Sequence, residues 1–317
     1  MSFSSKVKEE LSAVIPSARH CQIAELASIL QFCGKVYPLR QNGNTPILIK
    51  IHTENELVAR KCFTLLKKAF NIYPSVAVRQ SSRQSRNLSY ILTVDRTEEV
   101  RSILQTCKWY EDFIQDGEVS LRTHSLLLKS NCCKRSFLRG AYLAIGSMSD
   151  PEKSYHLEYV CFRQEDALFL VDILKSFSLE GKIVLRKRYY VVYLKEGEGI
   201  VDLLNVMEAH VALMELENTR ILKEVRNSVN RRVNCEAANI TKTVNAATRQ
   251  IEDILYIKEH YGLENLPDNL CEIAMVRLDN PEVSLKELGE LLSPKVGKSG
   301  VNHRLRKLTE IADRLKV

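Results

Sequence analysis

The feature that most constrains this fold is an internal repeat. Two stretches, about residues 20–110 and about 130–215, share one order of elements: helix, strand, helix, two strands, helix. Apolar residues recur every three or four positions in the helical parts and alternate in the strands, which are the periods of those structures. We therefore expect two copies of one α+β unit.

The apolar residues of each copy place its elements. The first copy opens with a helix that ends at Gly34, followed by a strand over 46–51, a helix over 57–66, strands over 75–79 and 90–94, and a helix from Thr97. The second opens with a helix that ends at Gly146, followed by a strand over 156–161, a helix over 167–174, strands over 182–186 and 190–194, and a helix over 200–206. A glycine at each helix end is typical of a C-cap or of a close helix contact.

The two opening helices carry a recognisable motif. Residues 26–34 read LASILQFCG and residues 138–146 read LRGAYLAIG. Both resemble the motif that gives LAGLIDADG homing endonucleases their name. The resemblance implies that the two helices pack at a pseudo-twofold axis and that a curved sheet forms a saddle for DNA. We predict a pseudo-twofold duplicated LAGLIDADG-like domain over residues 1–217.

The motif positions that are acidic in active relatives hold no acid here. In those enzymes carboxylates at the helix ends hold Mg²⁺ against the scissile phosphates, because hard cations take oxygen ligands. The matching residues are Gln31 and Cys33 in the first copy and Leu143 and Ile145 in the second. Asp150, the nearest acid downstream, precedes a proline and is typical of a hairpin turn. We predict no catalytic residue and no metal; a residual Mg²⁺-dependent endonuclease is the alternative.

Basic residues recur at matched places in the two repeats. They lie near the hairpin between the last two strands of each copy: Arg79, Arg83, Arg86, Arg186, Lys187 and Arg188. We predict a secondary DNA contact here, because cations at matched positions favour a shared surface for an anion. Solvated hairpin loops, a protein partner on this domain and a small-molecule pocket between the halves are alternatives that stay open.

The C-terminal part has a different pattern. Residues 218–240 break the repeat with polar and basic residues and are predicted to be a linker. Residues 241–317 are predicted to be an all-α helix-turn-helix domain. Its first helix, over 243–261, ends before Gly262, and a second helix stops at Asn280-Pro281.

A capping box follows, with Ser284 at the N-cap and Glu287 three residues later, and it starts a short helix. A turn that contains Gly297 leads to a last helix over 300–315, which Ser299 is expected to cap. A short helix, a glycine-bearing turn and a longer helix are the order of a helix-turn-helix.

The last helix has one apolar stripe and one polar, basic face. The stripe consists of Val301, Leu305, Leu308, Ala312 and Leu315. At 100° per residue, four side chains point away from it and are predicted to reach base edges: Ser299, Asn302, His303 and Arg306. The flanking cations and the cap hydroxyl are predicted to complete the DNA contact: Ser284, Lys295, Lys298, Arg304 and Lys307. No Asp or Glu occurs from residue 293 to residue 309. The alternative is a solvated basic face on an ordinary helix pair.

Four segments outside the motif helices are similar to the WhiA family. They read PEKSYHL over 151–157, NCEAAN over 234–239, SLKELGELL over 284–292 and SGVNHRL over 299–305. The resemblance covers nearly the whole chain. It implies a DNA-binding regulator linked to cell division and chromosome segregation, and in spore-forming actinobacteria to sporulation genes. It leaves open whether the protein regulates transcription or coats the nucleoid.

Composition agrees with this interpretation without proving it. The net charge of +7 permits an anionic partner. Apolar runs are too short for a membrane span, and charges near the N-terminus argue against export. The nine cysteines include no C-x-x-C pair, so we expect free thiols in a reducing cytosol and no zinc site. The sequence thus predicts a cytoplasmic, nucleoid-associated protein that binds double-stranded DNA, with no cofactor and no membrane contact.

Overall fold

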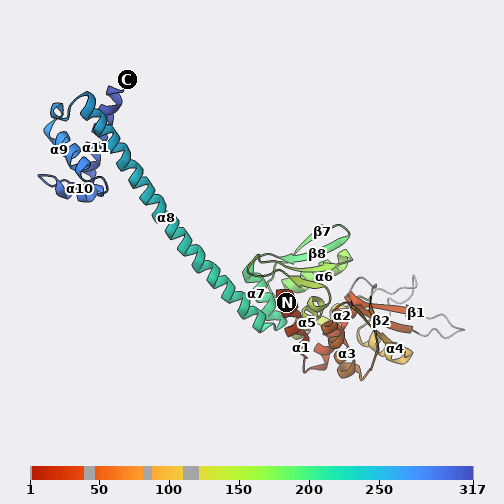
Figure 1. Cartoon of the computed structure of the whole chain (residues 1–317). Coiled ribbons are helices and arrows are strands. Elements are labelled where there is room, and N and C mark those ends of the chain that lie inside the picture. The colour runs from red at the N-terminus through yellow and green to blue at the C-terminus, as the bar shows by residue number, and fades with distance from the viewer. Residues whose placement is uncertain (1, 39–46, 81–87, 110–120, 317) are drawn as a thin grey trace. The chain divides into compact units, whose positions relative to one another are not determined.

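The computed structural model describes residues 2–38, 47–80, 88–109 and 121–316 (Figure 1). It divides into two compact units, Met1–Lys223 and Glu224–Val317, called here the first and the second unit. Within the described residues, no helix is both long enough and apolar enough to cross a membrane.

The first unit contains two four-stranded antiparallel sheets of identical topology. One has the order β1-β2-β4-β3, formed by Gly34–Pro38, Ile47–Thr53, Leu88–Val94 and Ser75–Gln80. The other has the order β5-β6-β8-β7, formed by Gly146–Met148, Leu157–Cys161, Tyr189–Leu194 and Lys182–Arg186. The matching orders confirm the duplication that the sequence predicts.

The helices of the first unit also repeat. Helices α2 (Arg19–Cys33), α3 (Glu56–Phe70) and α4 (Thr97–Thr106) correspond in order to α5 (Asn131–Ile145), α6 (Gln164–Lys175) and α7 (Gly197–Met207). Outside this correspondence lie α1 (Phe3–Ala13) and the short 3₁₀ helix Ser125–Leu128. Helix α1 and the strands β1 and β5 were not predicted from the sequence.

Both motif helices end at a glycine that begins a strand. Gly34 and Gly146 have extended backbones, so neither is a left-handed cap. A Cβ on Gly34 would lie 2.5 Å from the carbonyl oxygen of Leu30. A side chain therefore does not fit where the chain turns from helix directly into strand, and this tight passage is why the short strands escaped prediction.

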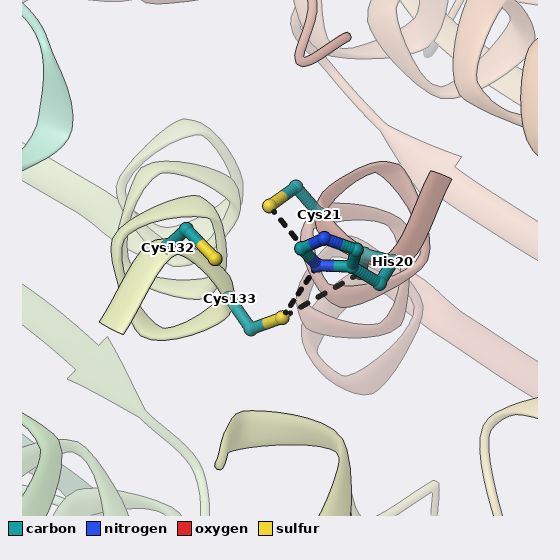
Figure 2. A group of neighbouring side chains, drawn as sticks. All are labelled: His20, Cys21, Cys132 and Cys133. Carbon is teal, nitrogen blue, oxygen red and sulfur yellow. Dashed lines mark hydrogen bonds between the residues drawn. The ribbon is translucent and has the colours of Figure 1, made fainter. Parts of the chain in front are cut away.

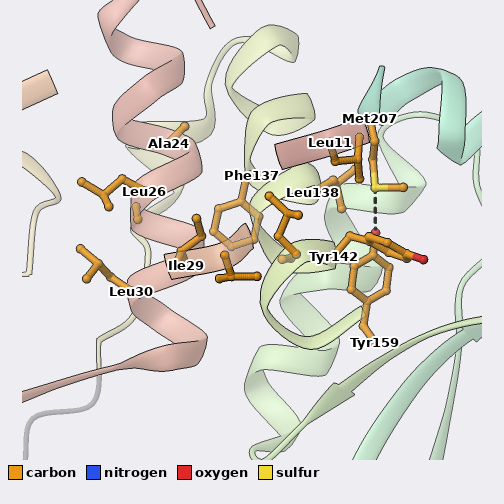
Figure 3. Packing of buried hydrophobic residues seen from close by; sticks show 14 of the residues in the cluster. Leu11, Ala24, Leu26, Ile29, Leu30, Phe137, Leu138, Tyr142, Tyr159 and Met207 are labelled. Atoms are coloured by element: carbon orange, nitrogen blue, oxygen red, sulfur yellow. Dashed lines mark hydrogen bonds between the residues drawn. The ribbon is translucent and has the colours of Figure 1, made fainter. Parts of the chain in front are cut away.

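Helices α2 and α5 form the centre of the first unit, side by side (Figure 3). Every residue of α2 from Cys21 to Gln31 is buried. The closest approach is at Gly140, where a Cβ would lie 2.6 Å from the carbonyl oxygen of Glu25. Phe137 of α5 packs edge-on against Phe32 of α2. The helix contact that the sequence suggested for the terminal glycines thus occurs inside the second motif instead.

A buried charge network fastens this helix pair. The carboxylate of Glu25 lies 3.0 Å from Lys61 Nζ of α3 and 3.2 Å from Arg139 Nε of α5. Arg139 also bonds Glu208, with 2.6 Å between NH1 and Oε2. Burial raises the pKa of Glu25 and lowers the pKa of Lys61, and in both cases the opposite charge counteracts burial.

The second unit is helical. Helix α8 (His210–His260) begins before the boundary of the units, and α9 (Asp268–Asp279), α10 (Leu285–Leu291) and α11 (Lys298–Leu315) follow, with a 3₁₀ turn over Leu263–Asn265. Gly262, at φ +84°, comes just after α8, and Asn280 caps α9. Residues 218–240 lie within α8, so this predicted linker is helical; the domain limits predicted from the sequence stay predictions.

The four helices of the second unit enclose one small core. It includes the apolar stripe of α11 and residues from each of the other helices: Ile254, Ile257, Leu270, Ile273, Leu288, Val301, Leu305, Leu308 and Ala312. Four of the five predicted stripe residues are buried, and Leu315 is half-buried. The opposite face of α11 is thereby left to solvent.

Candidate nucleic-acid interface

The capping box at the start of α10 forms as predicted. Ser284 Oγ accepts from the backbone N–H of Glu287 at 3.4 Å, and Glu287 Oε2 accepts from the N–H of Ser284 at 3.0 Å. The hydrogen bonds from Ser284 hold the pKa of Glu287 below its ordinary value. Ser284 is exposed, so its hydroxyl holds the helix end and lies at the surface as well.

The turn between α10 and α11 is built on Gly289. The N–H of Val296 donates to the carbonyl of Gly289 at 2.9 Å. A Cβ on Gly289 would lie 2.0 Å from the carbonyl oxygen of Val296, closer than any side chain tolerates. The absence of a side chain at this position therefore allows α10 to lie directly against the turn.

Helix α11 begins earlier than the sequence predicted. Its first residue is Lys298 and its N-cap is Gly297, with no side-chain hydrogen bond to the cap. The prediction that Ser299 caps this helix is wrong, because Ser299 already lies in its first turn. Its hydroxyl is consequently exposed on the helix surface.

Most of the predicted contact residues share the exposed side of this helix and turn. The exposed members are Lys295, Lys298, Ser299, Asn302, His303, Arg306 and Lys307. They surround the N-terminal part of α11, where no carboxylate occurs in the sequence. The arrangement presents cations for phosphates beside an amide and a guanidinium that can pair with base edges.

Arg304 differs from the other predicted residues. Its guanidinium points back to α9, where NH1 lies 3.7 Å from Glu272 Oε2 and 3.5 Å from the carbonyl oxygen of Asn269. The side chain is only 20% exposed. Arg304 thus bridges α11 and α9 in this structure, and spacing along the helix could not distinguish it from its exposed neighbours.

The predicted secondary contact is partly described. Arg79 is exposed on β3, and Arg186 ends the matching strand β7. Lys187, at φ +57°, turns the chain into β8, and Arg188 stacks on Tyr189 at 5.3 Å from the ring centroid. Arg83 and Arg86 lie outside the described residues.

One acid lowers the positive charge at the predicted secondary contact. Glu158 Oε2 lies 3.2 Å from NH1 of Arg186 and 3.0 Å from Nε2 of His156. Arg186 nevertheless remains well exposed, with 59% of its side chain accessible. The second repeat therefore offers a mixed surface, in contrast to the N-terminal part of α11, which carries no acid from Lys298 to Thr309.

Gln31, a motif position that is acidic in active relatives, forms hydrogen bonds with other parts of the first unit. Gln31 is buried; its Nε2 donates to Asp166 Oδ1 at 2.8 Å and its Oε1 accepts from the N–H of Thr123 at 3.0 Å. Asp166 in turn pairs with Arg163 at 2.9 Å. The carboxylate that bonds Gln31 is thus neutralised by an arginine, an arrangement that the sequence did not reveal.

Two of the other motif positions, Cys33 and Leu143, meet at a shallow pocket. Cys33, Leu143 and Lys8 line it, together with Glu54 and Glu56 from the segment after β2. Burial raises the pKa of the Cys33 thiol to about 11 and lowers the pKa of Lys8. A neutral thiol and an isobutyl group therefore stand at the two motif positions where two-metal hydrolysis would require carboxylates, and the acids of the pocket come from outside the motifs.

Asp150 has the role that its position before proline predicted. Its Oδ1 accepts from the backbone N–H of Glu152 at 3.0 Å, and its carbonyl accepts from the N–H groups of Lys153 and Ser154. These bonds form the turn between β5 and β6. The carboxylate is thus engaged in the turn.

Comparison with known proteins agrees with this architecture along the chain. The family model of the WhiA N-terminal LAGLIDADG-like domain matches residues 19–109, that of the WhiA LAGLIDADG-like domain matches 134–226, and that of the WhiA C-terminal HTH domain matches 229–312.

Curated relatives and a crystal structure match over the full length. The chain is 52% identical to a protein of Lachnoclostridium phytofermentans, with 100% of each covered, and 50% identical to one of Alkaliphilus oremlandii, covering 99% and 98%. Both relatives are described as probable cell division protein WhiA. The crystal structure of full-length WhiA from Thermatoga maritima aligns over 99% of both chains, with a TM-score of 0.59 and 28% identity. The chain, with its duplicated LAGLIDADG-like domain and its C-terminal helix-turn-helix region, belongs to the WhiA family.

Proposed function

We propose that this protein binds double-stranded DNA through α11 and acts as a regulator of cell division. The observation that carries the proposal is the exposed, basic N-terminal part of α11, which carries no acid from Lys298 to Thr309, in a unit that matches the family's helix-turn-helix model. The names of the relatives supply the link to cell division.

Each exposed group has a proposed role. Arg306 and Asn302 read base edges, since a guanidinium pairs with guanine and an amide pairs with adenine in the major groove. Lys298 and Lys307 contact phosphates and position the helix. His303 and Ser299 lie between these two sets and add polar contacts, while Lys295 extends the positive surface into the turn.

The first unit is proposed to be a scaffold without nuclease activity. The support is the pocket where the motif positions Cys33 and Leu143 carry no carboxylate and lie beside Lys8, so that its only acids, Glu54 and Glu56, come from outside the motifs. Incubation of full-length protein with supercoiled plasmid and Mg²⁺ or Mn²⁺ is expected to give no nicked product. Metal-dependent nicking that is lost on Glu54→Gln or Glu56→Gln would show a residual endonuclease and overturn this part of the proposal.

A secondary DNA contact on the first unit is proposed at Arg79 and Arg186. They occupy matching strands of the two sheets, β3 and β7, and both are exposed. The Glu158 carboxylate beside Arg186 makes this contact weaker than that of α11. A protein partner on the same unit stays a prediction.

The finer biological role is proposed to be regulation of transcription or organisation of the nucleoid, with an effect on chromosome segregation. The two modes predict different occupancy of the chromosome. Crosslinking and sequencing of bound DNA would give discrete sites for a transcription regulator and broad coverage for a nucleoid protein.

Matched charge-removal variants test the DNA contact. The variant Arg306→Ala/Lys307→Ala removes two cations from the exposed face of α11. The control Arg249→Ala/Lys258→Ala removes two exposed cations from α8 in the same unit. Both lower the net charge equally, so a difference between them reports on position.

Binding of each protein to duplex DNA is titrated at several salt concentrations. The α11 variant is expected to lower the slope of log affinity against log salt by about 0.9, for the lost phosphate contact of Lys307, and to weaken binding further through the lost base contact of Arg306. The α8 control is expected to retain the wild-type slope. Equal behaviour of the two variants would move the DNA contact away from α11, and the variant Arg79→Ala/Arg186→Ala would then show whether the first unit holds it.

A further inference from the structure

Four soft metal ligands meet where the two motif helices begin (Figure 2). His20 and Cys21 lie in the first turn of α2, and Cys132 and Cys133 lie in the first turn of α5. Their ligand atoms, one imidazole nitrogen and three thiol sulfurs, all lie within 4.8 Å of one another. Residues that are far apart in the sequence are thus brought to one place by the packing of the repeats.

Three of the four groups already interact directly, through the imidazole of His20. His20 Nδ1 lies 3.2 Å from Cys133 Sγ and 3.4 Å from Cys21 Sγ. By contrast, Cys62 and Cys107 are each surrounded by core residues. Thiols that serve only as small apolar side chains need no such gathering around a ring nitrogen.

This donor set is the one that Zn²⁺ selects. Structural zinc sites are four-coordinate and tetrahedral, with Zn–S bonds of about 2.3 Å and Zn–N bonds of about 2.0–2.1 Å. Such bonds place neighbouring ligand atoms about 3.4–3.8 Å apart. The contacts of His20, at 3.2 and 3.4 Å, are at or slightly below this separation, and the widest pair needs to close by about 1 Å, which side-chain rotation can supply.

The surroundings suit the charge of an occupied site. One Zn²⁺ with three thiolates and a neutral imidazole carries a net negative charge, and helix N-termini attract negative charge. The N-cap residues of α2 and α5, Ala18 and Ser130, make no side-chain cap bond. No cap side chain therefore competes with the sulfur atoms for the N–H groups at either helix end.

Burial divides the ligands into two inner and two outer ones. Cys21 and Cys133 are buried, whereas His20 and Cys132 are exposed. The inner pair is fixed by the core, and the outer pair leaves a path by which an ion can enter from solvent. This site lies at the N-terminal ends of α2 and α5, whereas the motif positions without acids lie at their C-terminal ends.

We propose that His20, Cys21, Cys132 and Cys133 bind one Zn²⁺ as a structural Cys₃His site. The ion ties the beginning of α2 to the beginning of α5 and so clamps the two repeats together. This proposal departs from the expectation of no zinc site that the missing C-x-x-C pairs gave, because here each repeat supplies two adjacent ligands and no single segment shows the spacing of a zinc motif.

Metal content and optical spectra of the full-length protein test the proposal. Protein purified without chelator is expected to contain about one Zn²⁺ per chain by elemental mass spectrometry. After removal of zinc under reducing conditions, Co²⁺ is added as the probe. Strong visible bands of tetrahedral Co²⁺ and thiolate-to-cobalt charge-transfer bands in the near ultraviolet are expected.

Single substitutions locate the ion. Cys132→Ser and His20→Asn change exposed ligands and leave the core intact, so both variants are expected to fold. Each substitution should weaken Zn²⁺ binding by more than about 100-fold, which exceeds the loss typical of an outer-shell partner. The control Cys235→Ser changes an exposed thiol of α8 and should bind like wild type. Added Zn²⁺ should raise the melting temperature of wild-type protein by at least about 5 °C and that of Cys132→Ser by much less.

Three outcomes would overturn the proposal. One is zinc-free protein that shows no tetrahedral Co²⁺ spectrum. Another is zinc that stays bound with unchanged affinity in both ligand variants. The third is a disulfide between Cys132 and Cys21 or Cys133 that mass spectrometry of peptides finds in protein prepared in reducing buffer. Cysteines joined in a disulfide cannot bind the ion as thiolates.

Discussion

The carboxylate of Glu25 accepts two hydrogen bonds from the guanidinium of Arg139, at 3.2 Å from Nε and 3.3 Å from NH2, across the interface of the two repeats. Glu25 directly precedes the first motif, and Arg139 lies inside the second. The two repeats are therefore not equivalent at their contact, since the first supplies the carboxylate and the second supplies the guanidinium.

Replacement of Arg139 by methionine is expected to destabilise the first unit strongly. The substitution leaves Glu25 buried with Lys61 as its remaining partner, and breaking a buried pair costs about 3–5 kcal/mol. We expect about 3 kcal/mol, because Lys61 keeps part of the compensation. Urea unfolding followed by the fluorescence of Trp109, the one tryptophan of the chain and buried in this unit, measures the change.

The matched control is Arg186→Met, which removes an arginine from an exposed pair with Glu158. Surface ion pairs contribute about 0–1 kcal/mol, so this variant should unfold almost as the wild type does. Similar losses in the two variants would mean that the buried network contributes no more than a surface pair.

Much of this fold could be predicted, and the failures have physical causes. Repeated elements such as β2 and β6 were found because their inward residues alternate and both copies show the same order. Strands β1 and β5 were missed because Gly34 and Gly146 carry the chain from helix to strand with no intervening turn. Polar residues 218–240 looked like a linker because no apolar face of α8 is buried there.

The sites were harder to predict than the elements. The exposed residues of α11 follow from helical periodicity, which fixes Asn302 and Arg306 opposite the buried stripe. Periodicity could not reveal that Arg304 turns back to Glu272, because that contact depends on the path of α9. Nor could periodicity reveal that Cys21 lies close to Cys133, since this contact depends on the packing of the two repeats.

Gly289→Ala is expected to destabilise the second unit. Alanine gains about 1 kcal/mol in helix propensity, but its Cβ would lie 2.0 Å from the carbonyl oxygen of Val296 and force the turn apart. Such overpacking costs about 1–3 kcal/mol, so the net effect should be a loss of stability and of DNA binding. Calorimetry of the full chain and DNA titration measure both.

Gly199→Ala in α7 is the control for this substitution. Its Cβ would meet Leu194 at 3.5 Å, an ordinary contact, so the propensity gain should leave stability unchanged or slightly higher. If Gly289→Ala behaved in the same way, the close approach of the turn would have no energetic significance.

Ser284 has two predicted roles, as a helix cap and as a DNA contact, and two substitutions separate them. Ser284→Ala removes the cap acceptor and should cost about 0.5–2 kcal/mol. Ser284→Asp keeps an acceptor and therefore most of the stability, but it adds a negative charge and should weaken DNA binding if phosphate lies nearby. Unchanged affinity of Ser284→Asp would leave Ser284 with the capping role alone.

The capping box also predicts a dependence on pH. The pKa of Glu287 lies below its ordinary value because Ser284 donates to the charged form. A depressed carboxyl pKa gives stability that is present above the unfolded-state pKa and is lost as the pH falls through the folded-state pKa. Glu287→Gln should therefore flatten the acid limb of the stability profile of the second unit, and an unchanged limb would show that other carboxyls determine it.

Arg306 and Lys307 are adjacent on α11, yet they are expected to fail in different ways when replaced by alanine. Loss of a base contact by Arg306 should cost about 1–3 kcal/mol on the preferred sequence and leave non-specific binding nearly unchanged, so discrimination falls. Loss of a phosphate contact by Lys307 should weaken binding to all duplexes alike and lower the salt slope by about 0.9. Competition titrations against duplexes with single base-pair changes distinguish the two effects. Uniform weakening by Arg306→Ala would assign this guanidinium to the backbone and leave Asn302 and His303 as the candidates that read the sequence.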